Sequence, residues 1–342
     1  MDSTLVLTGV IIAVALAFDF INGFHDAANS IATVVATRVL TPGQAVVWAA
    51  FFNFVAAFTF GTGVAKTVGS GMVDLHFITP WVILAGLIGA ITWDLFTWWI
   101  GLPTSSSHAL IGGYAGAAIA HVAYTRGINR AFDVIIWNGW TMTLLFIVAA
   151  PLIGMALAYV FMVVVYWTFR NATPKNMDKY FRRLQLVSAA ALSWSHGAND
   201  AQKTMGIITG VLVASGYLKS FQVPVPVIMA AYAAIALGTL SGGWKIVKTM
   251  GRRLTRLKPR SGFCAESAAA CSILFATWLH LPVSTTHVTA GAIAGVGSIQ
   301  RVKAVHWGVA RDILWAWVLT IPASAAVGWL ALTILHLCNP KL

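Results

Sequence analysis

The stretch GLPTSSSHALIGG, residues 101–113, sets four hydroxyl side chains and a histidine between strongly apolar segments. A closely similar stretch, LPVSTTHVTAGA, returns at residues 281–292. With an offset of 179 residues, Leu, Pro, Ser, His and Gly are identical, while Ser106 and Ser107 are replaced by Thr285 and Thr286. Because so polar a stretch is unexpected even once in an apolar chain, its return predicts an internal duplication.

The composition places the chain in the membrane class. Of its 342 residues, 58% are hydrophobic and 9% are charged, whereas soluble domains carry about 25% charged residues. A membrane-spanning helix needs about 20 apolar residues, and the chain offers ten stretches of roughly that length. They lie near residues 4–25, 43–65, 79–100, 108–125, 133–167, 184–204, 223–246, 262–280, 286–299 and 307–337. We therefore expect an all-α polytopic membrane protein.

A net charge of +12 could indicate binding to nucleic acid, but the positions of the basic residues indicate the orientation of the chain in a membrane instead. If the N-terminus lies outside and the chain crosses ten times, sixteen Lys and Arg residues fall inside and five outside, with Lys203 within a span. The inner loops of membrane proteins carry such an excess. The charge therefore predicts both termini outside the cell membrane, and no nucleic acid is expected as a partner.

Two further motif pairs support the duplication. NGFHDAANS at residues 22–30 is matched by HGANDAQKT at residues 196–204, and we call these two segments the acidic motifs. KTVG at residues 66–69 is matched by KTMG at residues 248–251. Because the three pairs keep one order along the chain, chance similarity is a poor explanation for them.

Each half carries five predicted spans, and an odd number turns the second copy upside down in the membrane. We expect an N-terminal inverted repeat at residues 1–167, a cytoplasmic linker at residues 168–183 and a C-terminal inverted repeat at residues 184–342. Inverted repeats are typical of secondary transporters, whose substrate site lies near the midplane on broken helices. The breaks are expected at the two acidic motifs and at the two hydroxyl stretches, residues 104–107 and 284–286.

The hydroxyl stretches suit the start of a helix. Proline lacks the amide hydrogen that an interior helix position needs, and Ser or Thr caps the free amides of a helix start. Free amides and the positive end of the helix dipole bind anions without a buried cation. By the inverted symmetry, we expect the two helix starts to hold one anion between them. His108 and His287 follow the stretches, and each either contacts the substrate or bonds a backbone carbonyl.

Asp26 and Asp200 lie within hydrophobic segments, where carboxylates are costly and are usually paired or functional. Amide side chains flank them at Asn22, Asn29 and Asn199. Carboxylate and amide oxygens together predict a site for a small cation, with protonation of the carboxylates as the alternative coupling chemistry. Lys203 either contacts the anion or pairs with one of the two carboxylates.

Three other acids fall within the predicted spans: Asp19, Asp94 and Glu266. Asp19 and Asp94 have no counterpart in the repeat, and either interior hydrogen bonding or function accounts for them. Glu266 is expected at the start of the eighth span, where the helix dipole alone would stabilise a carboxylate.

Ser, His and Asp within membrane spans also raise an intramembrane hydrolase as a hypothesis. A nucleophile and its base need one unique geometry, whereas this chain duplicates each partner and shows no nucleophile elbow. A passive channel is a further class, but the duplicated acidic motifs fit ion-coupled alternating access better. We therefore expect no enzyme activity and no bound cofactor.

Six motifs spread over nearly the whole chain carry a resemblance to a known family. They are GFHDAANSIAT (residues 23–33), HGANDAQKTMGI (196–207), LPTSSSH (102–108), LPVSTTH (281–287), GTLSGGWKIVKTMG (238–251) and SGFCAESAAA (261–270). With these motifs the chain resembles the inorganic phosphate transporters, the PiT family of cation–phosphate symporters.

The resemblance implies a homodimer, with phosphate bound at the tips of two re-entrant hairpins and sodium ions nearby. The implied phosphate contacts are Ser105, Ser106, Ser107, Ser284, Thr285, Thr286 and Asp26 or Asp200. The implied cation contacts are Asn22, Asp26, Asn29, Asn199 and Asp200, with Na⁺ expected at the last four. Glu266 matches an acidic position that is important in the family, which adds it to the residues expected to act in coupling.

The chain departs from the family pattern at His25, Gln202 and Lys203, where Asn or an Ala-Asn pair is more usual. An ammonium at Lys203 can replace a cation, so coupling to Na⁺ or to H⁺ stays open. The short central loop favours a bacterial inner (plasma) membrane. The predicted function is import of inorganic phosphate by symport and alternating access, and the alternative is a sulfate permease on the same scaffold.

Overall fold

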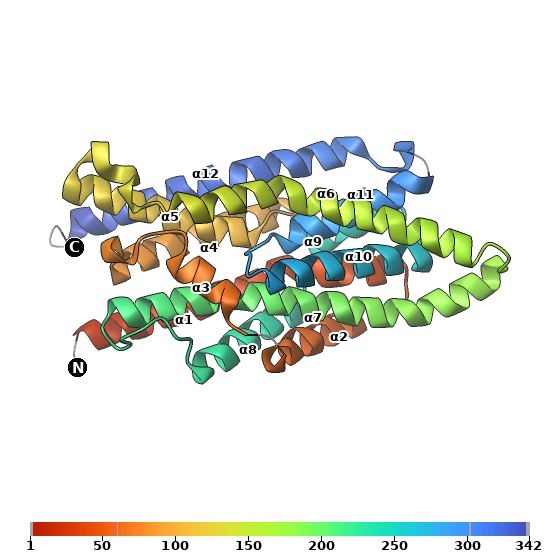
Figure 1. The fold of residues 1–342 in the computed structure, drawn as a ribbon, viewed down its shortest axis with the longest axis horizontal. Helices are drawn as coiled ribbons and strands as arrows, with labels where there is room; N and C mark the ends of the chain where they lie inside the picture. The colour runs from red at the N-terminus through yellow and green to blue at the C-terminus, as the bar shows by residue number, and fades with distance from the viewer. Residues whose placement is uncertain (1–2, 60, 301, 340–342) are drawn as a thin grey trace.

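Every regular element in the computed structural model is a helix, within residues 3–59, 61–300 and 302–339 that the structure describes (Figure 1). The α-helices are α1 (Ser3–Ala36), α2 (Pro42–Val55), α3 (Gly63–Ser70), α4 (Pro80–Ile100), α5 (Ser106–Arg126), α6 (Trp137–Thr168), α7 (Pro174–Ala214), α8 (Val225–Ser241), α9 (Trp244–Lys248), α10 (Pro259–Trp278), α11 (Thr285–Gln300) and α12 (Trp307–Cys338). Short 3-10 segments are η1 (Ala56–Phe58), η2 (Leu75–Phe77), η3 (Ile128–Val134) and η5 (Val302–Ala304), and η4 (Thr249–Arg253) is a π-helical turn. The all-α fold expected from the composition is confirmed.

Three helices begin with the same dipeptide, threonine followed by proline. Thr41, Thr79 and Thr173 are the N-caps of α2, α4 and α7, and each hydroxyl oxygen accepts the backbone N–H three residues on at 3.4 Å. Proline at the first helical position costs the helix no hydrogen bond, because the N–H that it lacks would have no partner inside the helix. The sequence therefore fixes these three helix starts locally.

The prediction of ten plain spans is wrong. Among the described residues, four helices are long and apolar enough to cross a membrane: α1 from Thr4, α4, α6 and α12. The predicted second and seventh spans are each broken into two helices, bent by 88° between α2 and α3 and by 62° between α8 and α9, and counting each bent pair as one span raises the total to six. A hydropathy average over the whole stretch does not show where its helix bends.

The acidic motifs do not break their helices, contrary to expectation. Residues 22–30 lie within the continuous helix α1, and residues 196–204 lie within the continuous helix α7. Neither motif contains a proline, so each backbone amide keeps a helical partner, and the polar side chains find their partners on other helices. A polar motif in an apolar helix therefore marked the site, and not a break in the chain.

Both hydroxyl stretches separate two helices, as expected. Helix α4 ends at Ile100, the next residue Gly101 has a left-handed φ of 75°, and α5 begins at Ser106. In the second half α10 ends at Trp278, His280 takes the same left-handed conformation with φ of 59°, and α11 begins at Thr285. His280 is the repeat equivalent of Gly101 at the offset of 179 residues, so the two hairpins turn in the same way.

The order of elements repeats along the chain. A long helix, a bent pair, a hairpin and a second long helix make up the first half (α1, α2–α3, α4–α5, α6), and the second half follows the same order (α7, α8–α9, α10–α11, α12). The packing is exchanged between the halves: α4 and α5 pack on α12, while α10 and α11 pack on α6. Likewise α1 packs on α8 and α7 packs on α2. The two halves therefore interlock and are not separate domains.

The connection between the halves is shorter than the linker expected at residues 168–183. Helix α6 ends at Thr168 and α7 begins at Pro174, so the last ten residues of the expected linker are helical. This turn lies at one end of the molecule, and both chain termini lie at the other end (Figure 1). Arg301 and Lys341, which contribute to the predicted charge pattern, lie outside the described residues.

Glycines within the acidic motifs let backbones of the two halves come close together. A Cβ atom on Gly23 of α1 would lie 2.1 Å from the carbonyl oxygen of Ile235 on α8. At the equivalent crossing, a Cβ atom on Gly197 of α7 would lie 2.5 Å from the carbonyl oxygen of Asn53 on α2. Small residues at such crossings allow close helix packing in membranes. The same kind of close crossing is therefore present in both halves.

Gly23→Ala is expected to lower the free energy of unfolding by about 1–3 kcal/mol, because the added methyl group forces α1 and α8 apart. Gly9→Ala on the same helix is the matched control, since nothing lies within 4 Å of its Cβ position; alanine favours the helix there by about 1 kcal/mol. The measurement is the midpoint of thermal unfolding in detergent. Equal midpoints for the two variants would contradict the close crossing.

Candidate functional site

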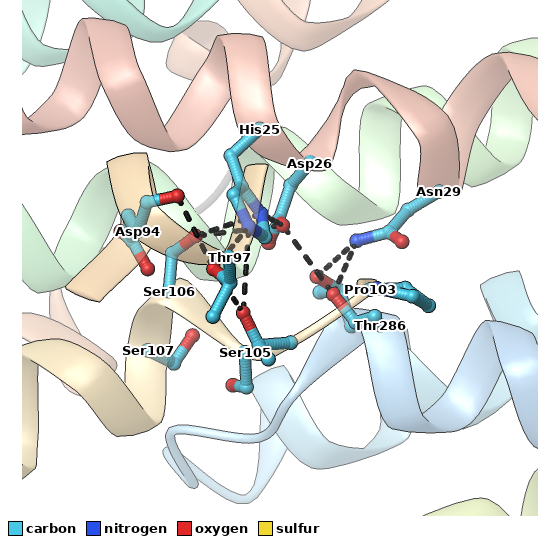
Figure 2. Close-up of polar contacts among 12 residues, drawn as sticks. His25, Asp26, Asn29, Asp94, Thr97, Pro103, Ser105, Ser106, Ser107 and Thr286 are labelled. Carbon is cyan, nitrogen blue, oxygen red and sulfur yellow. Dashed lines mark hydrogen bonds and ion pairs between the residues drawn. The ribbon is translucent and has the colours of Figure 1, made fainter. Parts of the chain in front are cut away.

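The two hairpin tips meet the middle of α1 and α7 from opposite directions. Helices α4 and α5 lie in the part of the molecule nearer the termini, and α10 and α11 lie in the part nearer the turn between α6 and α7 (Figure 1). Their hydroxyl side chains and the acidic motifs converge in one buried cluster, part of which Figure 2 shows. The structure thus brings together residues from four separate stretches of sequence.

The first hydroxyl of each helix start is used as a cap. The Ser105 side chain accepts the backbone N–H of His108 at 3.2 Å, and the Ser284 side chain accepts the backbone N–H of His287 at 3.2 Å. Capping satisfies one free amide at each helix start and fixes where the following hydroxyls lie. The next two positions in each half, Ser106 with Ser107 and Thr285 with Thr286, point toward α1 and α7.

Asp26 of α1 is contacted by both hairpin tips. Its Oδ1 atom accepts hydrogen bonds from Ser106 Oγ and from Thr286 Oγ1, each at 3.4 Å (Figure 2). The same oxygen lies 2.8 Å from Nδ1 of His25. The carboxylate is 2% exposed, so protein groups replace the water that it loses on burial.

Asp200 of α7 has the equivalent position in the second half. Its Oδ2 atom accepts from Thr285 Oγ1 at 3.1 Å and lies 3.1 Å from Nε2 of His196. Asp26 with Ser106 and Asp200 with Thr285 are therefore the same contact made twice. Oδ1 of Asp200 accepts from Nζ of Lys203 at 2.5 Å, so of the two expectations for this lysine, pairing with a carboxylate is the one observed.

Asn29 and Lys203 occupy equivalent positions and also bind the tips. Nδ2 of Asn29 donates to Thr286 Oγ1 at 2.9 Å and to Thr285 Oγ1 at 3.2 Å. Nζ of Lys203 donates to Ser107 Oγ and, at 2.9 Å, to the carbonyl oxygen of Val283. Lys203 is 1% exposed. The tips therefore meet the carboxylates of Asp26 and Asp200 and the ammonium group of Lys203, all of them buried.

Two residues expected to bind a cation have an unused acceptor. The side-chain oxygens of Asn22 and Asn199 are buried and have no hydrogen-bond partner among the described residues. The amide nitrogen of Asn199 donates to Thr277 Oγ1 at 2.9 Å and to Leu281 O at 3.2 Å, which holds the group in place. A buried carbonyl oxygen without a donor is costly unless a proton donor or a cation satisfies it.

The sequence analysis assigned no contact to four residues of this cluster: His25, Thr97, Thr104 and His196. His25 bonds Thr97 and Thr104 through Nε2, at 3.1 and 3.4 Å. His196 brings a ring nitrogen to the centre, where ligand atoms of Asp26, His196 and Asp200 lie within 4.8 Å of one another and are able to hold a metal ion. His196 stands four residues before Asp200, and that spacing places both on one face of a helix, which is the signal that would have found it.

Glu266 contacts a different set of residues, and both of its carboxylate oxygens accept hydrogen bonds. It accepts from Thr33 Oγ1 at 2.5 Å, from Gln185 Nε2 at 2.8 Å and from Ser188 Oγ, so it joins α10 to α1 and α7. The expectation that it stands at a helix start is wrong, because α10 begins at Pro259. Its burial is compensated by side chains of neighbouring helices and not by a helix dipole.

The two histidines that follow the hydroxyl stretches pack the tips together. The rings of His108 and His287 lie edge to face with centroids 4.8 Å apart, and His287 stacks on Trp317 at 3.7 Å. Nε1 of Trp317 donates to the carbonyl oxygen of Pro103 at 3.1 Å. These contacts fix the distance between the two tips.

The fold and the site together define a polytopic membrane protein whose duplicated helix starts converge on buried charges. A family profile described as the phosphate transporter family matches residues 22–328. The chain belongs to this phosphate transporter family, which confirms the resemblance seen in the motifs. Membership in a family of transporters also agrees with the expectation that the chain is not an enzyme.

Relatives of known description cover nearly the whole chain. A protein of Rhizobium meliloti described as a probable low-affinity inorganic phosphate transporter is 54% identical over 96% of both chains. A Bacillus subtilis protein with the same description is 45% identical over 98% of this chain and 99% of its own. A solved structure titled "The sodium-dependent phosphate transporter" superimposes with a TM-score of 0.84 at 25% identity, over 97% of this chain and 99% of that one.

Ser105→Ala and Ser284→Ala are each expected to lower the free energy of unfolding by about 1 kcal/mol, because each removes a helix cap. The control is Ser70→Ala, whose hydroxyl bonds only the Lys66 carbonyl on its own helix; its expected effect is within about 0.5 kcal/mol. Thermal unfolding in detergent measures all three. If the two cap variants were as stable as the control, the assignment of Ser105 and Ser284 as caps would be wrong.

Proposed function

We propose that the chain is a secondary active symporter that imports inorganic phosphate together with Na⁺ or H⁺ by alternating access. The observation that carries the proposal is the convergence of both hairpin tips on Asp26, with the Ser106–Asp26 contact repeated as Thr285–Asp200. A site shared by two halves changes its access when the halves move relative to each other. Family membership and the descriptions of the relatives support phosphate as the substrate.

The tips have the chemistry to replace water around a tetrahedral oxyanion. The starts of α5 and α11 supply free amides and the positive ends of two helix dipoles. The donor hydroxyls proposed to bind phosphate belong to Ser106, Ser107, Thr285 and Thr286, with Ser105 and Ser284 holding the two helix starts. Lys203 and Asn29 bring further donors to the same hydroxyls.

Asp26 and Asp200 give the site a reason to select phosphate. A carboxylate acceptor repels a fully ionised anion, but it accepts a hydrogen bond from an anion that still carries a proton. Phosphate carries a proton near neutral pH and sulfate does not. The relatives described above are named for phosphate, so they give the sulfate alternative no support.

The coupling ion would bind at acceptors that the protein leaves free. The side-chain oxygens of Asn22 and Asn199 supply neutral oxygen ligands, and Asp26 and Asp200 supply charged ones, with Asn29 nearby. Hard oxygen ligands suit Na⁺, and the same carboxylates are able to carry H⁺. Glu266 would act in coupling from a distance, because it joins the second hairpin to α1 and α7.

The membrane arrangement follows from the same proposal. The α4–α5 and α10–α11 hairpins would be re-entrant, entering an inverted repeat from opposite faces of a bacterial inner membrane. Both termini would lie on the periplasmic side, which agrees with their position at one end of the molecule (Figure 1). The halves at residues 1–167 and 184–342, and assembly into a homodimer, stay predictions.

Uptake of labelled phosphate into proteoliposomes tests the proposal. An inward gradient of Na⁺ or of H⁺ is expected to drive phosphate above its equilibrium level, and excess sulfate is expected not to compete. Failure of both gradients to drive accumulation would overturn the symporter. Competition by sulfate as strong as by unlabelled phosphate would overturn the selectivity.

Asp26→Asn is expected to reduce the initial rate of phosphate uptake at least about tenfold, because it removes a charged acceptor that both tips contact. The control is Asp133→Asn, since Asp133 is exposed on η3. Immunoblotting of membranes checks that both variants are inserted equally. Uptake by Asp26→Asn equal to that of the control would show that the site lies elsewhere.

A further inference from the structure

The ammonium group of Lys203 is surrounded by oxygen atoms from three separate elements. Its Nζ atom bonds Oδ1 of Asp200 on α7 at 2.5 Å, Oγ of Ser107 on α5, and the carbonyl oxygen of Val283 before α11 at 2.9 Å. The side chain is 1% exposed. The group therefore lies between both hairpin tips and one of the two central carboxylates.

This set of partners fits a positive charge. An ammonium group has three N–H donors and no acceptor, and Lys203 has three oxygen acceptors. A carboxylate, a hydroxyl and a backbone carbonyl are also the kinds of oxygen that bind small hard cations. The ammonium group therefore fills a place that a dissociable cation would otherwise suit.

The other half of the protein shows what this position does without a charge. Asn29 is the repeat equivalent of Lys203, and its amide donates to Thr286, the equivalent of Ser107. The neutral amide reaches the equivalent hydroxyl on the hairpin tip of the opposite half. A positive charge is therefore not needed to hold a tip against a long helix.

A purely structural role for the lysine is also poor on energetic grounds. Burying an ion pair costs desolvation energy that its mutual attraction only partly returns, and neutral replacements are often as stable or more stable. The chain nevertheless keeps the charge at the point where both tips meet. The charge is best explained by the ligand, because an anion that enters beside Asp26 and Asp200 needs positive charge nearby.

We propose that Lys203 is a tethered counter-cation that takes the place of one dissociable cation on the α7 side of the phosphate site. The proposal rests on the proposed function and deepens it. Because the charge is covalently attached, phosphate binding needs no Na⁺ from solution, so of the two coupling ions proposed above this inference selects H⁺. The solved structure with a similar fold is titled as sodium-dependent, so the proposal predicts a difference between two proteins of one fold.

The test is phosphate binding to the purified full-length chain by calorimetry, with Na⁺ present or replaced by N-methylglucamine. Wild-type protein is expected to bind phosphate with affinities that differ less than about threefold between the two buffers. Lys203→Asn, which copies the residue of the other half, is expected to bind at least about tenfold more weakly without Na⁺ and to regain affinity when Na⁺ is added. Binding of ²²Na⁺ is expected to rise in this variant.

Two controls define the outcome. Lys203→Met fills the space with an apolar chain, so it is expected to lose binding without rescue by Na⁺. Lys66→Asn changes an exposed lysine of α3 and is expected to bind like wild type. Three results would each overturn the tethered cation. The first is that wild-type protein binds phosphate only when Na⁺ is present. The others are that Lys203→Asn binds phosphate as tightly as wild type without Na⁺, or that it binds weakly and Na⁺ does not restore its affinity.

The wild-type comparison keeps the proposal testable if neither Lys203 variant folds, since it needs no substitution. Failure of the proposed function is a separate result. It appears as absence of phosphate binding by the wild type in both buffers and of accumulation under both gradients. A tethered cation without symport appears instead as Na⁺-independent phosphate binding with no gradient-driven accumulation.

Discussion

The rest of the structure depends on the burial of Asp26 and Asp200 in the middle of two membrane-length helices. A carboxylate at such depth is stable only when hydrogen-bond donors or positive charges replace its water. The hairpin tips supply those donors from both sides, through Ser106 and Thr286 at Asp26 and through Thr285 at Asp200. The continuous helices, the interrupted hairpins and the interlocked halves all serve to bring these groups together.

The two halves share their local geometry and differ in their chemistry. The glycine crossings at Gly23 and Gly197 and the two capping serines keep the halves equivalent in backbone and packing. Within that shared frame, Asn29 and Lys203 contact equivalent hydroxyls with groups of different charge. The positive charge is therefore placed on one side of a nearly symmetric site, where it can act on the substrate without altering the fold.

The sequence predicted the structure best where the conformation depends on residues that are close together in the chain. Proline and serine chemistry predicted the breaks before α5 and α11, and the repeat predicted which residues would meet. It was least informative where the outcome depends on long-range contacts. The acidic motifs were expected to break α1 and α7, and the donors on other helices that let them stay helical are not visible in the sequence. Glu266 was misplaced for the same reason, because its partners Thr33 and Gln185 are far away in the chain.

The most direct test of the central claim is an experimental structure of the protein with bound phosphate. The account predicts density for one phosphate between the two hairpin tips, within hydrogen-bond distance of at least one of Ser106 and Ser107, at least one of Thr285 and Thr286, and a carboxyl oxygen of Asp26. Phosphate bound to only one tip, or at a place remote from both Asp26 and Asp200, would contradict it.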